Sequence, residues 1–252
     1  MMHNWPKKDI EVNAMISAVR TRPMRALSIP PTLVDVVEFV KPGQHVLVTE
    51  VSWKAYEELL IWRDANRRGV RLTYDRGRLE IMVVTNLHER LRKVLAMLLE
   101  AWLSETGGKY LSSGQLTHQR EDLERGFEPD ECYYIQNWKA VGGLREIDFV
   151  KDPPPDLMIE VEVSRKVDNR LPIIASFRIP EVWRYDGKKL SVLILQNAKK
   201  YKSSPKSLAV PDFPFDEALR FLAMAASIEN DHGTIDRQFR AWIRSQLSKK
   251  SK

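Results

Sequence analysis

The sequence has few features of secreted, zinc-stabilised or membrane-spanning proteins. Its 252 residues contain a single cysteine, Cys132, which excludes an internal disulfide and a cysteine-rich zinc site. No stretch approaches the roughly 20 consecutive apolar residues that a membrane-spanning helix needs. The N-terminal segment lacks the apolar core and small-residue cleavage site of a secretory signal. We therefore expect a cytoplasmic protein that does not associate with a membrane.

The composition indicates a folded protein with a mild excess of positive charge. Apolar residues make up 43% and charged residues 29% of the chain, which excludes a wholly disordered protein and allows one large domain or two small ones. Forty lysines and arginines against 34 acidic residues leave a net charge of +6. This charge is compatible with a polyanionic partner but does not require one.

Hydrophobic periodicity predicts an α/β (α+β) protein. Apolar residues recur at helical spacing over 53–65 and 86–105, where Ser52 and Asn86 can cap the helices. Alternating apolar positions around a turn predict a β-hairpin over 70–84. Further strands are predicted at 110–111, 115–119, 130–136, 156–164, 181–185 and 190–195, and further helices at 168–178, 215–226 and 233–247. We expect a mixed β-sheet flanked by helices over 45–200, an N-terminal arm over 1–44 and a C-terminal helical tail over 201–252.

The predicted strand at 156–164 is the most informative segment for chemistry. Side chains alternate faces along a strand, so the odd positions form an apolar face and the even positions include Asp156, Glu160 and Glu162. Glu160 and Glu162 would lie about 6.6 Å apart and repel each other. A hard cation such as Mg²⁺ would remove this repulsion. The alternative is a half-exposed strand with a solvated acidic face.

Two acidic residues elsewhere in the chain could join this face. Asp130 stands at the start of an apolar strand, and it can reach Glu160 if the two strands are neighbours. Otherwise it ends a loop, which is a common role for aspartate. Glu89, beside His88 in the first turn of the helix at 86–105, suits a helix N-terminus and could also pair with Lys93 on the surface.

Arg170 supplies a positive charge in the helix predicted after the acidic strand. Folded back over the carboxylates, its guanidinium could hold a phosphate or the attacking water. The alternative is a surface arginine that pairs with Asp168.

Several motifs together resemble the Uma-two family, whose members are described as restriction endonucleases. The motifs follow in the family's order across about residues 45–200 and are Leu72–Met82, His88-Glu89, Glu128–Ile135, Pro154–Val161 and Ile179–Asp186. The resemblance implies membership of the PD-(D/E)XK nuclease superfamily and a restriction-endonuclease-like core.

The resemblance also implies roles for single residues. Asp130 matches the motif aspartate, Glu160 the motif glutamate and Glu89 the acidic residue of the preceding helix. The superfamily's lysine two residues after the glutamate is absent, because position 162 is glutamate. Arg170 stands where the family often has a lysine in the following helix, and Ile174 where many relatives have tyrosine. Unlike lysine, arginine stays charged and cannot exchange protons.

These roles predict an endonuclease that hydrolyses phosphodiester bonds in DNA. Asp130, Glu160 and Glu89 would hold Mg²⁺ or Mn²⁺, with Glu162 as a further carboxylate and Arg170 as an electrostatic clamp. Basic residues would contact the phosphate backbone of the DNA without reading its base sequence. These residues are Arg90, Arg92, Lys93, Arg165 and Lys166. The resemblance is also compatible with a homodimer.

Two other functions stay open at this point. The first is a catalytically silent module that keeps the fold and binds nucleic acid or another partner, which the replacement of lysine by Arg170 favours. The second is a glycosidase with paired carboxylates, which the family resemblance disfavours.

Overall fold

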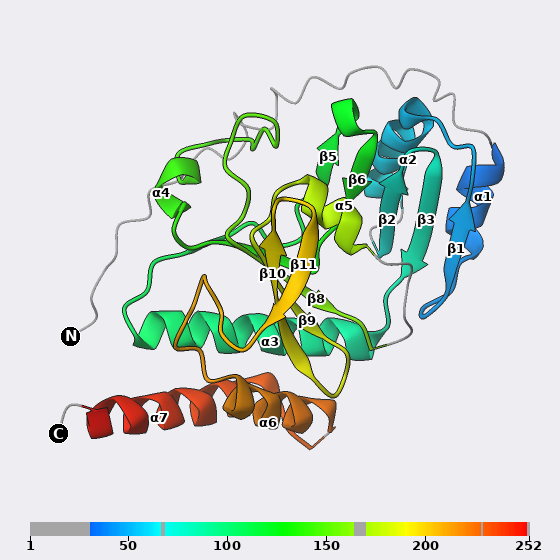
Figure 1. The fold of residues 1–252 in the computed structure, drawn as a ribbon. Coiled ribbons are helices and arrows are strands. Elements are labelled where there is room, and N and C mark those ends of the chain that lie inside the picture. The colour runs from blue at the N-terminus through cyan, green and yellow to red at the C-terminus, as the bar shows by residue number, and fades with distance from the viewer. Residues whose placement is uncertain (1–30, 67–68, 164–169, 228, 251–252) are drawn as a thin grey trace, which may run out of the picture.

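The computed structural model describes residues 31–66, 69–163, 170–227 and 229–250, and Figure 1 shows their arrangement. The helices of this part are α1 (Pro31–Phe39), α2 (Trp53–Asn66), α3 (Asn86–Glu105), α4 (Trp138–Val141), α5 (Leu171–Ser176), α6 (Phe215–Ala226) and α7 (His232–Lys250). The strands are β1 (His45–Val48), β2 (Val70–Asp75), β3 (Arg78–Val83), β4 (Leu111–Ser112), β5 (His118–Arg120), β6 (Arg125–Phe127), β7 (Glu131–Tyr134), β8 (Leu157–Val161), β9 (Glu181–Tyr185), β10 (Leu190–Gln196) and β11 (Lys200–Ser204).

The strands form two sheets rather than one. The first sheet has the order β1-β3-β2-β6-β5 and its pairs are antiparallel. The second sheet has the order β11-β10-β9-β8-β7-β4 and is mixed, because β8 and β9 run parallel and are joined through α5. The predicted mixed α/β class is therefore confirmed, and the chain passes from the first sheet to the second through α3.

The long helix α3 organises the main core. Its apolar side packs against β8, and α6 and α7 pack against α3. Figure 1 shows α3 running below the second sheet, with α6 and α7 beneath it. Phe221 of α6 and Phe239 of α7 are fully buried in this core. The C-terminal helices therefore complete the apolar layer that α3 and the sheet begin.

The first sheet has two different faces. One face packs on α1 and α2 through a second apolar cluster that includes Val37, Tyr56 and Leu72. The other face carries polar side chains and lines pockets toward the second sheet, including Thr73 and Glu80. Alternation along the strands thus leaves one face of this sheet available to a functional site.

Most predicted elements agree with the structure in position, and the differences have local causes. Ser52 Oγ accepts a hydrogen bond from the Ala55 amide and caps α2 as predicted. Helix α3 is capped by Thr85 rather than Asn86, because the Thr85 side chain accepts from the His88 amide. Leu87, one of the apolar residues at helical spacing over 86–105, is 46% exposed. Helices α1 and α4 and strands β1, β6 and β11 were not predicted, and α1 lies within the segment predicted as an arm. Residues 1–30 of that arm lie outside the described residues.

No helix in the described part of the chain combines the length and apolar character needed to cross a membrane.

His118 is a buried histidine that makes the fold sensitive to acid. Its ring stacks on Phe127 and Phe149, and its Nδ1 lies 2.8 Å from the Leu116 carbonyl oxygen. Burial lowers the pKa of His118 to about 4. Since the unfolded chain binds this proton more readily, the contribution to stability is complete above pH 6.5 and is lost as the pH falls toward 4.

We expect the substitution His118→Phe to remove this sensitivity. Relative to wild type, the variant should gain about 2–3 kcal/mol of unfolding free energy between pH 7 and pH 4.5. Urea denaturation at both pH values measures the difference. A constant difference between the two proteins across this range would show that folding does not lower the pKa of His118.

Candidate functional site

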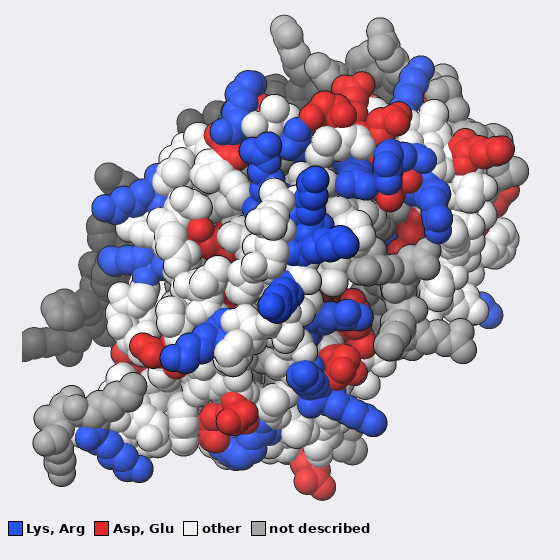
Figure 2. Space-filling view, in the orientation of Figure 1, with Lys and Arg blue, Asp and Glu red and all other residues white. Residues whose placement is uncertain are grey.

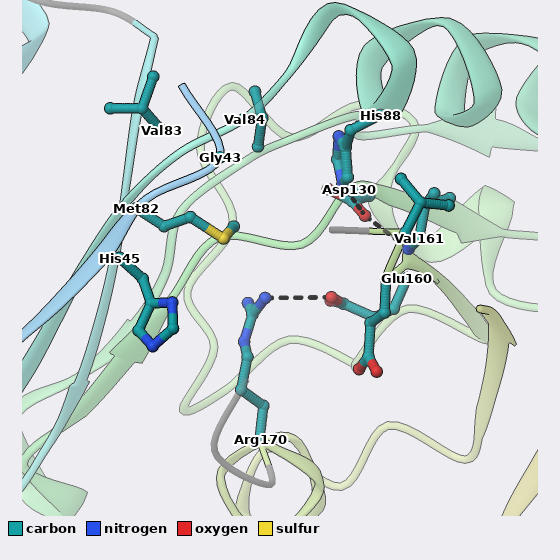
Figure 3. Close-up of a pocket in the computed structure, with 12 residues that line it drawn as sticks. Gly43, His45, Met82, Val83, Val84, His88, Asp130, Glu160, Val161 and Arg170 are labelled. Carbon is teal, nitrogen blue, oxygen red and sulfur yellow. Dashed lines mark hydrogen bonds and ion pairs between the residues drawn. The ribbon is translucent and has the colours of Figure 1, made fainter. Parts of the chain in front are cut away.

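The candidate site is a pocket between the two sheets. Figure 3 shows Asp130 and Glu160 on one side, His45 and Met82 on the other, and Arg170 between them. The side chains come from separate parts of the chain: the first turn of α3, the residue before β7, the end of β8, the residue before α5, and strands β1 and β3. The full lining is Gly43, His45, Met82, Val83, Val84, His88, Asp130, Glu160, Val161, Glu162, Val163 and Arg170.

Asp130 is held in the pocket from three directions. The β7–β8 register, continued by one residue, places it across from Glu160. Its Oδ2 accepts a hydrogen bond from the Val161 amide at 2.7 Å and lies 3.1 Å from His88 Nε2. Burial opposes its negative charge, but His88 and Arg71 outweigh burial and hold the pKa of Asp130 below its usual value. Asp130 is therefore an ionised carboxylate in a buried position.

Glu160 lies in the middle of the pocket wall and is only 5% exposed. Arg170 Nη1 donates to its Oε2 at 3.1 Å, whereas its buried Oε1 has no hydrogen-bond partner among the residues that the structure describes. Burial raises the pKa of Glu160 to about 7, and the neighbouring carboxylates of Asp130 and Glu162 add to the effect despite Arg170. An unsatisfied buried carboxylate oxygen costs free energy that a bound cation or proton would recover.

His88 and Glu89 form an ionic group beside Asp130. Burial disfavours a charged imidazole, but the hydrogen bond to Asp130 and the ion-pair contact with Glu89 overcome it and raise the pKa of His88 to about 9. Burial likewise opposes the charge of Glu89, yet His88, Arg92 and Arg71 lower its pKa to about 2. Glu89 Oε2 accepts from Arg92 Nη2 at 2.8 Å, and its Oε1 lies 3.3 Å from Arg71 Nη2. Glu89 thus faces cations of the protein, and its predicted metal-binding role stays a prediction.

Arg170 contacts both Glu160 of β8 and the segment that precedes β7. Besides Glu160, its guanidinium donates from Nη2 to the Glu128 carbonyl oxygen at 2.8 Å, and it lies over the Phe127 ring. Ile174, one turn further along the chain, belongs to α5 and is buried in an apolar cluster with Phe127. Asp168, the surface partner that we considered for Arg170, lies outside the described residues.

Two carboxylates of the predicted acidic face point to other partners. Glu162 lines the pocket but accepts a hydrogen bond from Arg184 Nε at 2.8 Å. Asp156 accepts hydrogen bonds from the backbone amides of Ile135 and Asn137 and so fixes the loop after β7. Both faces of β8 are buried, so Glu160 does not lie on a solvated face.

Among the basic residues predicted to contact DNA, Arg92 binds Glu89 and Glu131, and Arg90 donates to the Ser227 carbonyl oxygen. Lys93 is exposed on α3. Arg165 and Lys166 lie outside the described residues.

Arg71 is a site residue that sequence reasoning missed. It lies on β2 and is buried, and its Nη1 donates to the Pro129 carbonyl oxygen at 2.8 Å. Its Nη2 lies 3.4 Å from Asp130 Oδ1 and 3.3 Å from Glu89 Oε1. No signal in the sequence pointed to this role, because Arg71 alternates with apolar residues in the predicted hairpin and is indistinguishable there from a solvent-facing position. Its burial among carboxylates depends on the packing of the second sheet.

The carboxylates fit a magnesium ion in the manner usual for this metal. Mg²⁺ keeps several waters and is commonly bound by one or two carboxylates together with phosphates of the substrate. Within the described residues Glu160 Oε1 has no hydrogen-bond partner, and Asp130 Oδ1 makes a long contact of 3.4 Å with Arg71 Nη2. Among the residues that the structure describes, no three His, Cys, Asp or Glu side chains converge as a complete metal cage. Two protein carboxylates completed by water and phosphate are therefore the arrangement that these residues allow.

The fold and the pocket define a mixed α/β protein with a buried acidic pair opposed by arginine. Residues 53–220 match the family model described as Uma2, putative restriction endonuclease, and the chain belongs to this family. The match confirms the resemblance to the Uma-two family that the motifs indicated.

The solved structures include a putative nuclease of the DUF820 family from Anabaena variabilis that is similar to this chain. The two share 14% sequence identity with a TM-score of 0.42, over 62% of this chain and 91% of the other. No curated protein matches the chain at a significant level.

Proposed function

We propose that the protein is a metal-dependent endonuclease that hydrolyses phosphodiester bonds in DNA. Membership of the Uma2 family supports a nuclease. The observation that carries the proposal is the unpartnered Oε1 of Glu160, buried beside the ionised Asp130 and within reach of Arg170. Most buried polar groups have a hydrogen-bond partner, so an unpartnered carboxylate oxygen that faces a pocket favours a site that binds a further group over a purely structural ion pair.

The chain's residues divide the work of the reaction. Asp130 and Glu160 would hold Mg²⁺ or Mn²⁺, which when bound lowers the pKa of a water and neutralises charge on the phosphate. His88 and Arg71 hold Asp130 ionised and in place. The Arg170 guanidinium, aimed into the pocket, would stabilise negative charge that develops on the phosphate oxygens. Arginine cannot take up a proton at neutral pH, so its role is electrostatic.

A basic surface beside the pocket supports DNA as the substrate. Figure 2 shows lysine and arginine side chains gathered over α5, β11 and the adjoining ends of β2 and β3, with acidic side chains among them. Exposed basic residues of these regions include Arg76 in the turn between β2 and β3, Arg178 after α5, and Lys200 and Lys202 of β11. Such residues would contact phosphates without reading the bases, so binding should weaken steeply with salt.

One observation favours a silent nucleic-acid-binding module as the second candidate. Arg170 already neutralises one oxygen of Glu160 and is itself tied to the Glu128 carbonyl. A site whose acidic pair is balanced by protein cations can persist without a metal.

Cleavage of supercoiled plasmid in the presence of Mg²⁺ or Mn²⁺ tests the proposal. We expect the wild-type protein to nick or linearise the plasmid, and Asp130→Asn to lower the rate about 100-fold because the metal loses a charged ligand. The asparagine can still accept from the Val161 amide, and Glu89 remains as a counter-charge for His88 and Arg71. Cleavage that survives in Asp130→Asn would point to a contaminating nuclease.

Calorimetric titration of Mg²⁺ separates the two candidates. Metal and DNA binding by the wild-type protein, without any cleavage, would establish the silent module. Absence of metal binding would remove the basis of the nuclease proposal, whereas binding that is lost in Asp130→Asn supports it.

A further inference from the structure

His45 is the one imidazole on the wall that faces the acidic pair, within the part of the chain that the structure describes. It opens β1, opposite Met82 in the β1–β3 register, and both side chains line the pocket. Figure 3 shows the His45 ring directed toward the space in which Arg170 meets Glu160. The neighbouring pair, Leu47 and Glu80, continues the same face of the sheet into the adjacent pocket. The first sheet therefore places a titratable group across the cavity from Asp130 and Glu160.

The geometry of phosphodiester hydrolysis suggests a role for the side of the pocket that the first sheet forms. The attacking and leaving oxygens lie on opposite sides of the phosphorus in an in-line displacement. If the acidic pair organises the attack, the leaving oxygen departs toward the first sheet. That oxygen must take up a proton, and the nearby Arg170 cannot give one up at neutral pH. An imidazolium can donate a proton in this pH range, and general acid catalysis contributes about 10²–10⁴-fold.

We propose that His45 is the general acid that protonates the leaving oxygen, an inference that rests on the proposed nuclease function. A bond forms between the water oxygen and phosphorus, and the bond between phosphorus and the leaving oxygen breaks. The electron pair stays on the leaving oxygen, which takes the imidazolium proton. The attacking water gives its proton to solvent, and His45 is reprotonated from solvent, so atoms and charge balance over the cycle.

The charged groups around His45 act on its protonated form in opposite directions. The Glu160, Glu162 and Asp130 carboxylates across the pocket attract an imidazolium, as does Glu80 on the neighbouring strand β3. The Arg170 guanidinium repels it, and His88 at the far edge of the pocket carries a positive charge as well. Because His45 is exposed at the mouth of the pocket, solvent screens these interactions and can return its proton.

A substrate whose leaving group needs no protonation tests whether His45 acts as the general acid. The bond cut by the wild-type protein is first mapped on plasmid, and an oligonucleotide is made with sulfur in place of the leaving oxygen at that bond. A thiolate leaves without protonation. We expect His45→Gln to slow cleavage of the ordinary bond about 100-fold and to cut the sulfur substrate within a few-fold of the wild-type rate. Equal slowing on both substrates, or no slowing on either, would overturn the proposal.

Two further readouts exclude indirect effects. Magnesium affinity by calorimetry should be unchanged in His45→Gln, and a loss would make His45 a ligand of the metal instead of an acid. His232→Gln, which changes an exposed histidine on α7 outside the pocket, should cut both substrates as wild type does.

If the wild-type protein cuts neither substrate, the proposed function fails and the role of His45 fails with it. If wild type cuts both and His45→Gln does so equally well, only the role of His45 fails.

Discussion

Replacing Glu160 by glutamine is expected to abolish cleavage and, above pH 7, to stabilise the protein. Burial and the adjacent carboxylates raise the pKa of Glu160 from an ordinary value near 4.5 to about 7. The folded protein therefore holds a proton that the unfolded chain releases between pH 4.5 and pH 7, so wild-type stability falls as the pH rises through this window. Glutamine carries no charge, keeps an acceptor for Arg170 and avoids this loss.

The expected size follows from the shift in pKa. Between pH 5 and pH 8 the unfolding free energy of Glu160→Gln should rise by about 2–3 kcal/mol relative to wild type. Plasmid cleavage should fall about 10³-fold, because the site loses a charged metal ligand. Urea denaturation at the two pH values and the plasmid assay measure the two effects on the same preparation. A residue kept at a cost in stability is typical of a functional site.

Glu146→Gln provides the matched control, since Glu146 is exposed in the loop after α4. This variant should cut plasmid as wild type does and change stability by less than about 0.5 kcal/mol. If Glu160→Gln cuts plasmid at the wild-type rate, Glu160 has no part in the chemistry. If its stability relative to wild type does not change with pH, Glu160 is ionised throughout this range.

Replacing Arg71 by methionine is expected to be the most destabilising change at the site. The guanidinium is buried and contacts Asp130, Glu89 and the Pro129 carbonyl oxygen. Without it, two carboxylates lose a counter-charge in a region that water reaches poorly. Removing one partner of a buried ion pair typically costs about 3–5 kcal/mol, and we expect a loss of unfolding free energy in this range.

Arg237→Met tests whether the loss comes from burial. Arg237 is exposed on α7 and contacts Thr234 of the same helix, so its replacement should change the unfolding free energy by less than about 0.5 kcal/mol. Thermal or urea unfolding of both variants gives the comparison. A loss below about 1 kcal/mol in Arg71→Met would mean that His88 and Arg92 alone balance the acidic group.

The candidate site shows how far sequence reasoning reached. The motifs pointed to Asp130, Glu160, Glu162 and Arg170, and the structure places all four around one pocket. The motifs could not show that Glu162 turns to Arg184 or that both faces of β8 are covered. Alternation along a strand shows which residues share a face, but it does not show what packs on that face.

Arg71 and His45 mark the limit of that reasoning. They lie 59 and 85 residues before Asp130 in the chain and belong to the other sheet. Neither residue stands in a motif that names a role for it. Their positions beside the acidic pair depend on how the first sheet lies against the second, which is a long-range arrangement.

The amino-acid sequence by itself determined the helices α2, α3, α6 and α7, the hairpin of β2 and β3, and the strands that carry the acidic motifs. These features depend on interactions between residues that are close in the chain, such as helical periodicity, capping and turn chemistry. Only the tertiary structure decided that the strands form two sheets and that a histidine and an arginine of the first sheet face carboxylates of the second. Such juxtapositions follow from the packing of distant segments against each other, which no local pattern records.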